Sequence, residues 1–382
     1  MSLCFVSFGI AVSLAELLLR QFSPQYDGHN DLFQPDPQLG WRFIPEQVTS
    51  VAWANEASHY VTINESGFRD APFSRHKPGD KTILCIGDSF VSNLAVRDKQ
   101  VFTRLMEDEL SNTSVLNLGV NGYGQTQALL LLQQQLDLHQ TDLVVMFIYL
   151  RNDYTDNVNS SWIYPRPITT QTPPDRFEIL PPNNTHSPQG SRWHSLTRSH
   201  VLSLINHTVN DLVHRWEAEP NGFRPTETTP PELYLCSNEP WEGVDQLQAT
   251  MQHLLLKIRE LCQLRKIPVL FVIAPTLYQV DDQSWASLLG HYGEDELKYD
   301  RTLPNTKLLE FATQHGIKML DLLPELRRSS QTGTSLYHRR EQHWTPAGNA
   351  VVADFLVRFL QSEAWPSTKP SFSIDSQAPE IE

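Results

Sequence analysis

The sequence lacks the features that indicate several common protein classes. It has only four cysteines, Cys4, Cys85, Cys236 and Cys262, and no CxxC pair. That is too few for a disulfide scaffold, and it argues against zinc-ribbon and thioredoxin-like sites. There is no HExxH motif, the histidines lack metal-ligand spacing, and no GxGxxG follows the first strand of the main domain. We therefore expect no metal and no bound cofactor, and a dinucleotide-binding or flavodoxin-like function is disfavoured.

Positive charge is also scarce. The chain carries 30 Lys and Arg against 44 Asp and Glu, a net charge of −14. A phosphate backbone would be repelled, so nucleic acid is not an expected partner. Hydrophobic residues make up 40% of the 382 residues, enough to bury a substantial core. The length fits either about two domains or one large α/β domain with insertions.

One long apolar run stands near the N-terminus. Residues 3–19 are apolar apart from two serines and Glu16, and Arg20 follows. A secretory signal would begin with basic residues, and none precede this run. We interpret residues 1–20 as a membrane anchor or signal-like segment, with a membrane as the expected partner. An amphipathic or buried N-terminal helix is the alternative.

From Thr82 onward, short apolar runs alternate with segments of helical spacing. The expected strands cover residues 82–86, 114–120 and 142–150 and begin again at 268 and 317, and the expected helices begin at 101, 127, 244, 306 and 347. Strands that are apolar on both faces are typical of parallel sheets covered by helices. We predict an α/β fold, a three-layer sandwich with a five-stranded parallel sheet, over residues 81–361.

Three segments do not follow this alternation. Residues 21–80 are rich in Pro, Asn and Asp and are expected to form an irregular or β extension. Residues 155–240 form a long insertion, in which an apolar stripe from Val201 to Trp216 predicts one helix. That helix is expected to pack on the main domain rather than to form a membrane-surface lid. Residues 362–382 are expected to be a C-terminal tail.

Polar residues follow three of the predicted strands, at the carboxyl ends where open parallel sheets bind ligands. Gly87-Asp88-Ser89 exposes a hydroxyl at a strand-to-helix turn, as a nucleophilic serine requires, although such residues also make ordinary helix caps. Closely spaced glycines in residues 117–124 let backbone approach a substrate or make a tight turn. Asn152 could donate a hydrogen bond to an oxyanion or belong to a turn.

A fourth element lies just before the last predicted helix, where His343 stands on a loop with Glu341 nearby. A histidine with a carboxylate partner is what a serine nucleophile needs as a general base. Each element has a structural explanation when taken singly. Their order along the chain, each at a predicted strand end or beside it, indicates one catalytic site.

Together these blocks resemble the SGNH hydrolases, also called GDSL esterases and lipases. The matching blocks are GDS at Ser89, NLGVNGYG with Gly122, the Asn-Asp pair with Asn152, and the block around His343. Residues 64–70 and 343–353 are similar to the membrane-anchored bacterial branch often associated with cell-surface polysaccharide. The resemblance covers roughly residues 38–361 and implies a flavodoxin-like sheet. It also implies that Ser89 is the nucleophile and His343 the base, with the Ser89 N–H, the Gly122 N–H and the Asn152 amide as the oxyanion hole.

The sequence departs from the family pattern in three places. Arg340 occupies the usual position of the acid, and Glu341 stands where a related branch has Asp. Leu150 and Arg151 replace the glycine before Asn152. Asn93 and Ala95 replace the glycines that commonly follow the nucleophile.

The expected function is that of a serine-dependent acyl-ester hydrolase, either a carbohydrate O-acetylesterase or an O-acyltransferase, acting outside the cytoplasm. Water and a sugar hydroxyl are alternative acceptors for one acyl-enzyme, so both reactions share a mechanism. The expected partner is an acylated small molecule or polysaccharide. The alternative is a catalytically weak carbohydrate-binding or polysaccharide-assembly protein that retains the same cleft.

Overall fold

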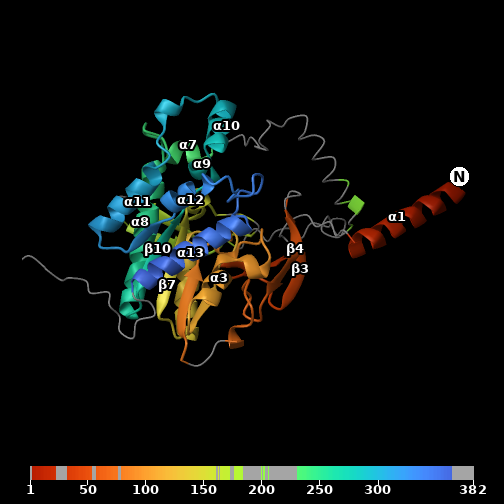
Figure 1. The fold of residues 1–382 in the computed structure, drawn as a ribbon, viewed down its shortest axis with the longest axis horizontal. Helices are drawn as coiled ribbons and strands as arrows, with labels where there is room; N and C mark the ends of the chain where they lie inside the picture. The colour runs from red at the N-terminus through yellow and green to blue at the C-terminus, as the bar shows by residue number, and fades with distance from the viewer. Residues whose placement is uncertain are drawn as a thin grey trace, which may run out of the picture.

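A computed structural model contains the predicted parallel sheet at its centre (Figure 1). It describes residues 2–22, 32–53, 57–75, 79–160, 162, 164–172, 176–183, 199, 201–202, 205 and 230–363. Most of the helix predicted between Val201 and Trp216, and nearly all of the predicted C-terminal tail, lie outside these residues.

The sheet has five strands in the order β11-β10-β7-β5-β6, and all neighbours are parallel. The strands are β5 (Lys81–Ile86), β6 (Thr113–Asn117), β7 (Leu143–Tyr149), β10 (Val269–Ala274) and β11 (Met319–Asp321). Every residue of the central strand β7 is buried, as its unbroken apolar sequence predicts. Because the strands are parallel, all five carboxyl ends lie along one edge of the sheet.

Helices cover both faces, so the predicted three-layer α/β fold is confirmed. One layer is formed by α4 (Gln125–Leu138), α8 (Val244–Leu264) and α11 (Leu303–Gln314), and the other by α3 (Phe102–Glu109), α12 (Leu323–Ser330) and α13 (Pro346–Ser362). Alternate residues of each strand face opposite layers: Leu84 packs in the first cluster and Ile83 in the second. Figure 1 shows α3 and α13 side by side on one face of the sheet.

Three antiparallel hairpins lie outside the sheet. They are β1 (Phe33–Asp36) with β2 (Gly40–Phe43), β3 (Gln47–Trp53) with β4 (Ala57–Ile63), and β8 (Ile168–Thr172) with β9 (Arg176–Leu180). The first two lie within residues 21–80, for which the sequence predicted an irregular or β extension. The third lies in the predicted insertion, for which the sequence predicted one helix.

Short helices connect these elements. They are α2 (Ser89–Ser92), α5 (Asn152–Asp156), α7 (Pro231–Leu235), α9 (Leu277–Val280), α10 (Asp282–Tyr292) and the 3-10 turns η2 (Phe73–Arg75), η3 (Asp98–Gln100) and η5 (Glu296–Lys298). Two of them, α2 and α5, begin directly after the carboxyl ends of β5 and β7. They carry the residues that the sequence singled out.

The apolar N-terminal run forms helix α1 (Ser2–Phe22). Its single acidic residue, Glu16, accepts hydrogen bonds from the Ser199 hydroxyl at 2.9 Å and from the Val201 N–H at 3.0 Å. Within the described ranges, no helix combines the length and the apolar character needed to cross a membrane.

Candidate active site

The predicted nucleophile lies where β5 turns into α2. Gly87 and Asp88 form the turn, and Ser89 is the first residue of the helix. The Asp88 carboxylate accepts a hydrogen bond from the Phe90 N–H at 2.8 Å, so Asp88 is the helix N-cap. Ser89 itself is only half-buried. Its hydroxyl therefore stands at the edge of the sheet where open α/β folds bind ligands.

A small hairpin in front of α13 carries the predicted base. The backbones of Tyr337 and Trp344 form an antiparallel bridge at its base. Trp344 is fully buried and packs edge-on against Phe90, with 4.9 Å between ring centroids. This anchor holds the neighbouring His343 beside the helix that carries Ser89.

The serine and histidine side chains meet. Ser89 Oγ and His343 Nε2 are 2.8 Å apart, within hydrogen-bond distance. Burial lowers the pKa of His343 to about 4, and a hydrogen bond with the backbone of Glu341 opposes this shift only in part. The positive charges of His338 and Arg151 lower the pKa of His343 further. The imidazole is therefore neutral at neutral pH and able to take the serine proton.

The hairpin also contains the two candidates for the acid position. Glu341 is partly buried and reaches His343 through its backbone, whereas Arg340 is exposed. A backbone carbonyl can fix the tautomer of an imidazole, but it lacks the full negative charge of a carboxylate. A role for the Glu341 carboxylate stays a prediction.

Asn152, a predicted oxyanion donor, begins α5 directly after β7. Its side-chain Nδ2 donates a hydrogen bond to Asp156 Oδ2, one turn further on, at 2.6 Å. Asp153 ties the same helix to the sheet by accepting a hydrogen bond from the Tyr149 N–H at 2.8 Å. An amide nitrogen carries two hydrogens, so the bond to Asp156 leaves one N–H of Asn152 for a ligand.

Gly122, the other predicted donor, lies in a loop where only glycine fits. Its φ is +77°, and an added Cβ would lie 2.7 Å from the ring of Trp162. The Gly122 carbonyl accepts a hydrogen bond from Arg166 Nη1 at 3.0 Å. The loop is joined to α2 because the Ser92 hydroxyl donates to Asn121 Oδ1 at 2.6 Å. The nucleophile helix and the glycine loop are thus held together as one unit.

Sequence reasoning missed the role of Arg151, which stands before Asn152 where the family has glycine. Its Nε lies 3.1 Å from Glu232 Oε1, and its Nη1 donates to the side chain of Gln342. Gln342 Nε2 in turn donates to the Tyr278 hydroxyl at 3.1 Å. The network joins the end of β7 to α7, α9 and the histidine hairpin. No pattern in the sequence signals it, because its members come from four distant segments and share no motif.

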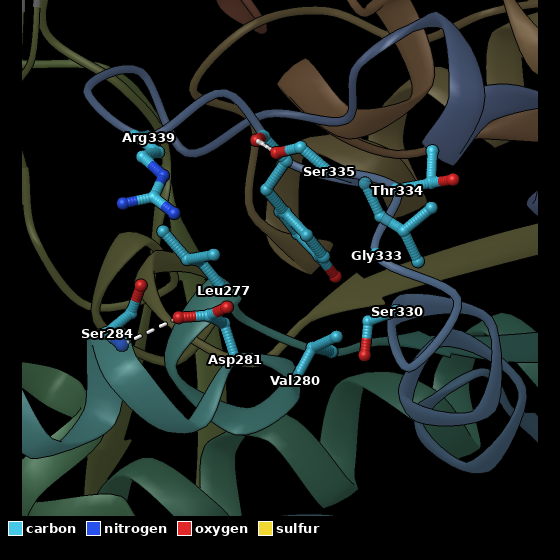
Figure 2. A pocket seen from close by; sticks show the side chains of 11 residues that line it. Leu277, Val280, Asp281, Ser284, Ser330, Gly333, Thr334, Ser335 and Arg339 are labelled. Atoms are coloured by element: carbon cyan, nitrogen blue, oxygen red, sulfur yellow. Dashed lines mark hydrogen bonds between the residues drawn. The ribbon is translucent and has the colours of Figure 1, made fainter.

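A pocket of about 180 Å³ lies beside the histidine hairpin. Its walls come from α9, α10, the end of α12 and the first residues of the hairpin, and neither Ser89 nor His343 lines it. Figure 2 shows Asp281 accepting a hydrogen bond from the Ser284 N–H, at 2.7 Å, with Arg339 above them. The pocket therefore separates the hairpin from α10 and is not the site of the serine. Among the residues that the structure describes, no three His, Cys, Asp or Glu side chains form a group that could hold a metal.

The C-terminal part of the chain, residues 240–380, matches the family model described as "SGNH hydrolase-like domain, acetyltransferase AlgX". This match supports the resemblance to the SGNH hydrolase superfamily. The matched range includes the histidine hairpin. Ser89 and His343 lie in the sequence motifs on which the resemblance to this superfamily rests. The match supports an acyl esterase or acetyltransferase.

Several solved structures are similar to this chain at low identity. A lipolytic G-D-S-L family protein from Veillonella parvula is 13% identical with a TM-score of 0.39, over 74% of this chain and 98% of that one. The acetyl xylan esterase AlAXEase is 13% identical with a TM-score of 0.39, over 73% and 99%. The esterase EstA from Pseudoalteromonas sp. is 10% identical with a TM-score of 0.37, over 75% and 99%. Likeness this distant carries no argument about substrate, and no curated protein matches the chain.

Proposed function

We propose that the protein is a serine-dependent acyl-ester hydrolase or O-acyltransferase whose substrates are acylated carbohydrates, with acetyl as the acyl group. The observation that carries the proposal is the 2.8 Å contact between Ser89 Oγ and Nε2 of a half-buried, neutral His343. A serine hydroxyl is a weak nucleophile until an adjacent base takes its proton. The acetyltransferase named in the family match supports acetyl as the transferred group.

In the proposed reaction, Ser89 Oγ attacks the acyl carbonyl carbon while His343 Nε2 takes the hydroxyl proton. The N–H groups of Gly122 and Asn152 stabilise the negative charge on the carbonyl oxygen. His343 then returns the proton to the leaving alcohol, and the acyl group remains on Ser89 as an ester. Water accepts the acyl group in hydrolysis, and a sugar hydroxyl accepts it in transfer, with His343 as the base in both.

An exposed tryptophan beside the proposed oxyanion hole supports a carbohydrate substrate. Trp162 is 45% exposed, and its ring lies against Gly122. Trp41 and Phe33 hold the ring, with 5.2 Å and 5.8 Å between centroids. A sugar ring presents an apolar C–H face that packs well on a fixed aromatic ring, while its hydroxyls stay in water. Trp162 is therefore the expected platform for the sugar next to the ester.

The first test is turnover of an activated acetyl ester by the parent protein and by Ser89→Ala. We expect the parent to be active and the variant to lose on the order of a thousandfold or more. A fluorophosphonate probe should label the parent at Ser89, as peptide mapping would show. A parent that binds an oligosaccharide but turns over no ester and takes no label would instead be a carbohydrate-binding protein.

The platform has its own test, in which KM is compared for two substrates. Trp162→Ala should raise KM for an acetylated oligosaccharide by about tenfold or more, and should leave KM for a small activated ester unchanged. An equal change for both substrates would contradict a sugar-specific role of Trp162.

We also propose that the activity lies outside the cytoplasm, with residues 1–20 attaching the protein to a membrane. The apolar composition of residues 3–19 supports this proposal. Fractionation of cells that express the full chain, or the chain without residues 2–22, provides the test. Recovery of both forms outside the membrane fraction would contradict the attachment.

A further inference from the structure

A buried ion pair links the two proposed oxyanion donors. Asp156 Oδ1 and Arg166 Nη1 are 2.8 Å apart, and their side chains are 12% and 2% exposed. The second carboxylate oxygen, Asp156 Oδ2, accepts the hydrogen bond from Asn152 Nδ2 at 2.6 Å. Arg166 Nη1 also donates to the Gly122 carbonyl at 3.0 Å. Three contacts thus run in series from the asparagine amide to the glycine loop.

The carboxylate decides which way the amide faces. An asparagine side chain can present either its oxygen or its nitrogen to a given neighbour, and an oxygen turned toward an oxyanion would repel it. An ionised carboxylate only accepts hydrogen bonds, so Asp156 draws the Nδ2 side of Asn152 toward itself. The remaining N–H on the same nitrogen is then oriented before substrate arrives, which is what an oxyanion hole requires.

The Arg166 guanidinium offsets the negative charge of the Asp156 carboxylate. Asp156 alone would place a negative charge one side chain away from the developing oxyanion, which would disfavour it. Arg166 compensates that charge at 2.8 Å and is itself held over the ring of Trp41, 5.2 Å from the centroid. Breaking a buried ion pair leaves an uncompensated charge, so the two residues act as a unit.

We propose that Asp156 and Arg166 are positioning residues for acyl transfer, which hold the Asn152 amide and the Gly122 loop in the arrangement that stabilises the oxyanion. The inference rests on the proposed function, since it requires an oxyanion to form next to Ser89. Neither residue touches the reacting atoms. Their effect passes through Asn152 and Gly122 alone.

A double-mutant cycle separates positioning from general stability. Asp156→Asn removes the negative charge with little change in shape. The side-chain amide of Asn152 can then rotate so that its oxygen and nitrogen exchange places. We expect kcat for an activated acetyl ester to fall about tenfold or more, with KM within about twofold. In an Asn152→Ala background the same substitution should add no further loss, because the amide that it orients is gone. Losses that multiply in the double variant, or a single variant with parental kcat, would overturn the inference.

Two further variants keep the result interpretable. Arg166→Lys keeps the positive charge beside Asp156 but shortens the side chain and removes the planar Nη1 group that contacts both partners, so kcat should fall by less than in Asp156→Asn. Arg166→Lys also serves as the test if a melting experiment shows that Asp156→Asn does not fold. In that case, a parental kcat in Arg166→Lys would overturn the inference. The matched control is Asp142→Asn, which breaks the ion pair of 2.8 Å with Lys81 at the opposite edge of the sheet and should keep the parental kcat. A parent without ester turnover overturns the proposed function together with this inference, whereas an active parent with unaffected variants overturns the inference alone.

Discussion

The proposed catalytic pair should keep working in acid, because its base is hard to protonate. Burial lowers the pKa of His343 to about 4. Histidine serves as the base only in its neutral form, and an ordinary imidazole with a pKa of about 6.5 is only about 10% neutral at pH 5.5. With a pKa of about 4, His343 is about 97% neutral at that pH. The acidic limb of kcat/KM should therefore be centred near pH 4, with nearly full activity at pH 5.5.

The assay is kcat/KM for an uncharged acetyl ester between pH 3.5 and pH 8, with the melting temperature measured in the same buffers. The ester must be uncharged so that substrate titration does not contribute to the profile. An acidic limb centred near pH 6.5 in folded protein would refute the reasoning, because it would show an imidazole that is neither desolvated nor held beside positive charge.

The lowered pKa of His343 also makes the free energy of unfolding depend on pH. The pKa of His343 is lower in the folded protein than in the unfolded chain, so below about pH 6.5 the unfolded chain binds more protons. This group's contribution to stability is therefore fully present above pH 6.5 and is lost as pH falls toward 4. A shift from 6.5 to about 4 corresponds to about 3 kcal/mol. His343→Gln should remove that part of the pH dependence of the free energy of unfolding.

Three further predictions concern single residues. Asn152→Ala should lower turnover by about a hundredfold or more at nearly unchanged melting temperature, because it removes one oxyanion donor, and unchanged turnover would show that the amide points away from the site. If the Glu341 carboxylate supports His343, Glu341→Gln should lose rate while Arg340→Ala keeps it. The reverse result would exclude Glu341, and equal parental rates would leave its backbone as the only contact that matters. Gly119→Ala should lower the free energy of unfolding by about 1–3 kcal/mol in a denaturant titration, because its Cβ would lie 2.3 Å from the Ser92 backbone nitrogen, and parental stability would refute so tight an approach.

The parallel sheet could be predicted because a short run of apolar residues marks each of its strands. All seven residues of β7 are apolar or aromatic and all are buried, so the run itself reports a strand covered on both sides. The helices expected from residues 101, 127, 244, 306 and 347 correspond to α3, α4, α8, α11 and α13. The strand expected over residues 114–120 ends earlier, at Asn117, because the chain there leaves the sheet to form the glycine loop. Boundaries of this kind depend on tertiary contacts that a local pattern does not contain.

The supporting contacts of the site could not be predicted in the same way. Asp156 lies at the end of a helix of five residues, and Arg166 lies in a segment that the sequence analysis assigned to an irregular insertion. Hairpin β8–β9 was missed because β8 is rich in threonine and follows prolines, as a loop often does, and because β9 is largely exposed. Contacts between such segments depend on how the chain folds in three dimensions. A single sequence does not reveal them.

The contact between Ser89 and His343 joins residues 254 positions apart, and this separation bears on how the protein acquires activity. The serine helix forms beside the first strand of the sheet, whereas the histidine arrives with α13, the last helix of the described chain. Closing a loop this long is costly in entropy, so we expect this contact to form after the intervening strands have been ordered. Secondary structure should therefore recover before esterase activity in a refolding experiment. The proposed catalysis therefore requires the whole domain to be folded, and a fragment that ends before the histidine hairpin should lack it.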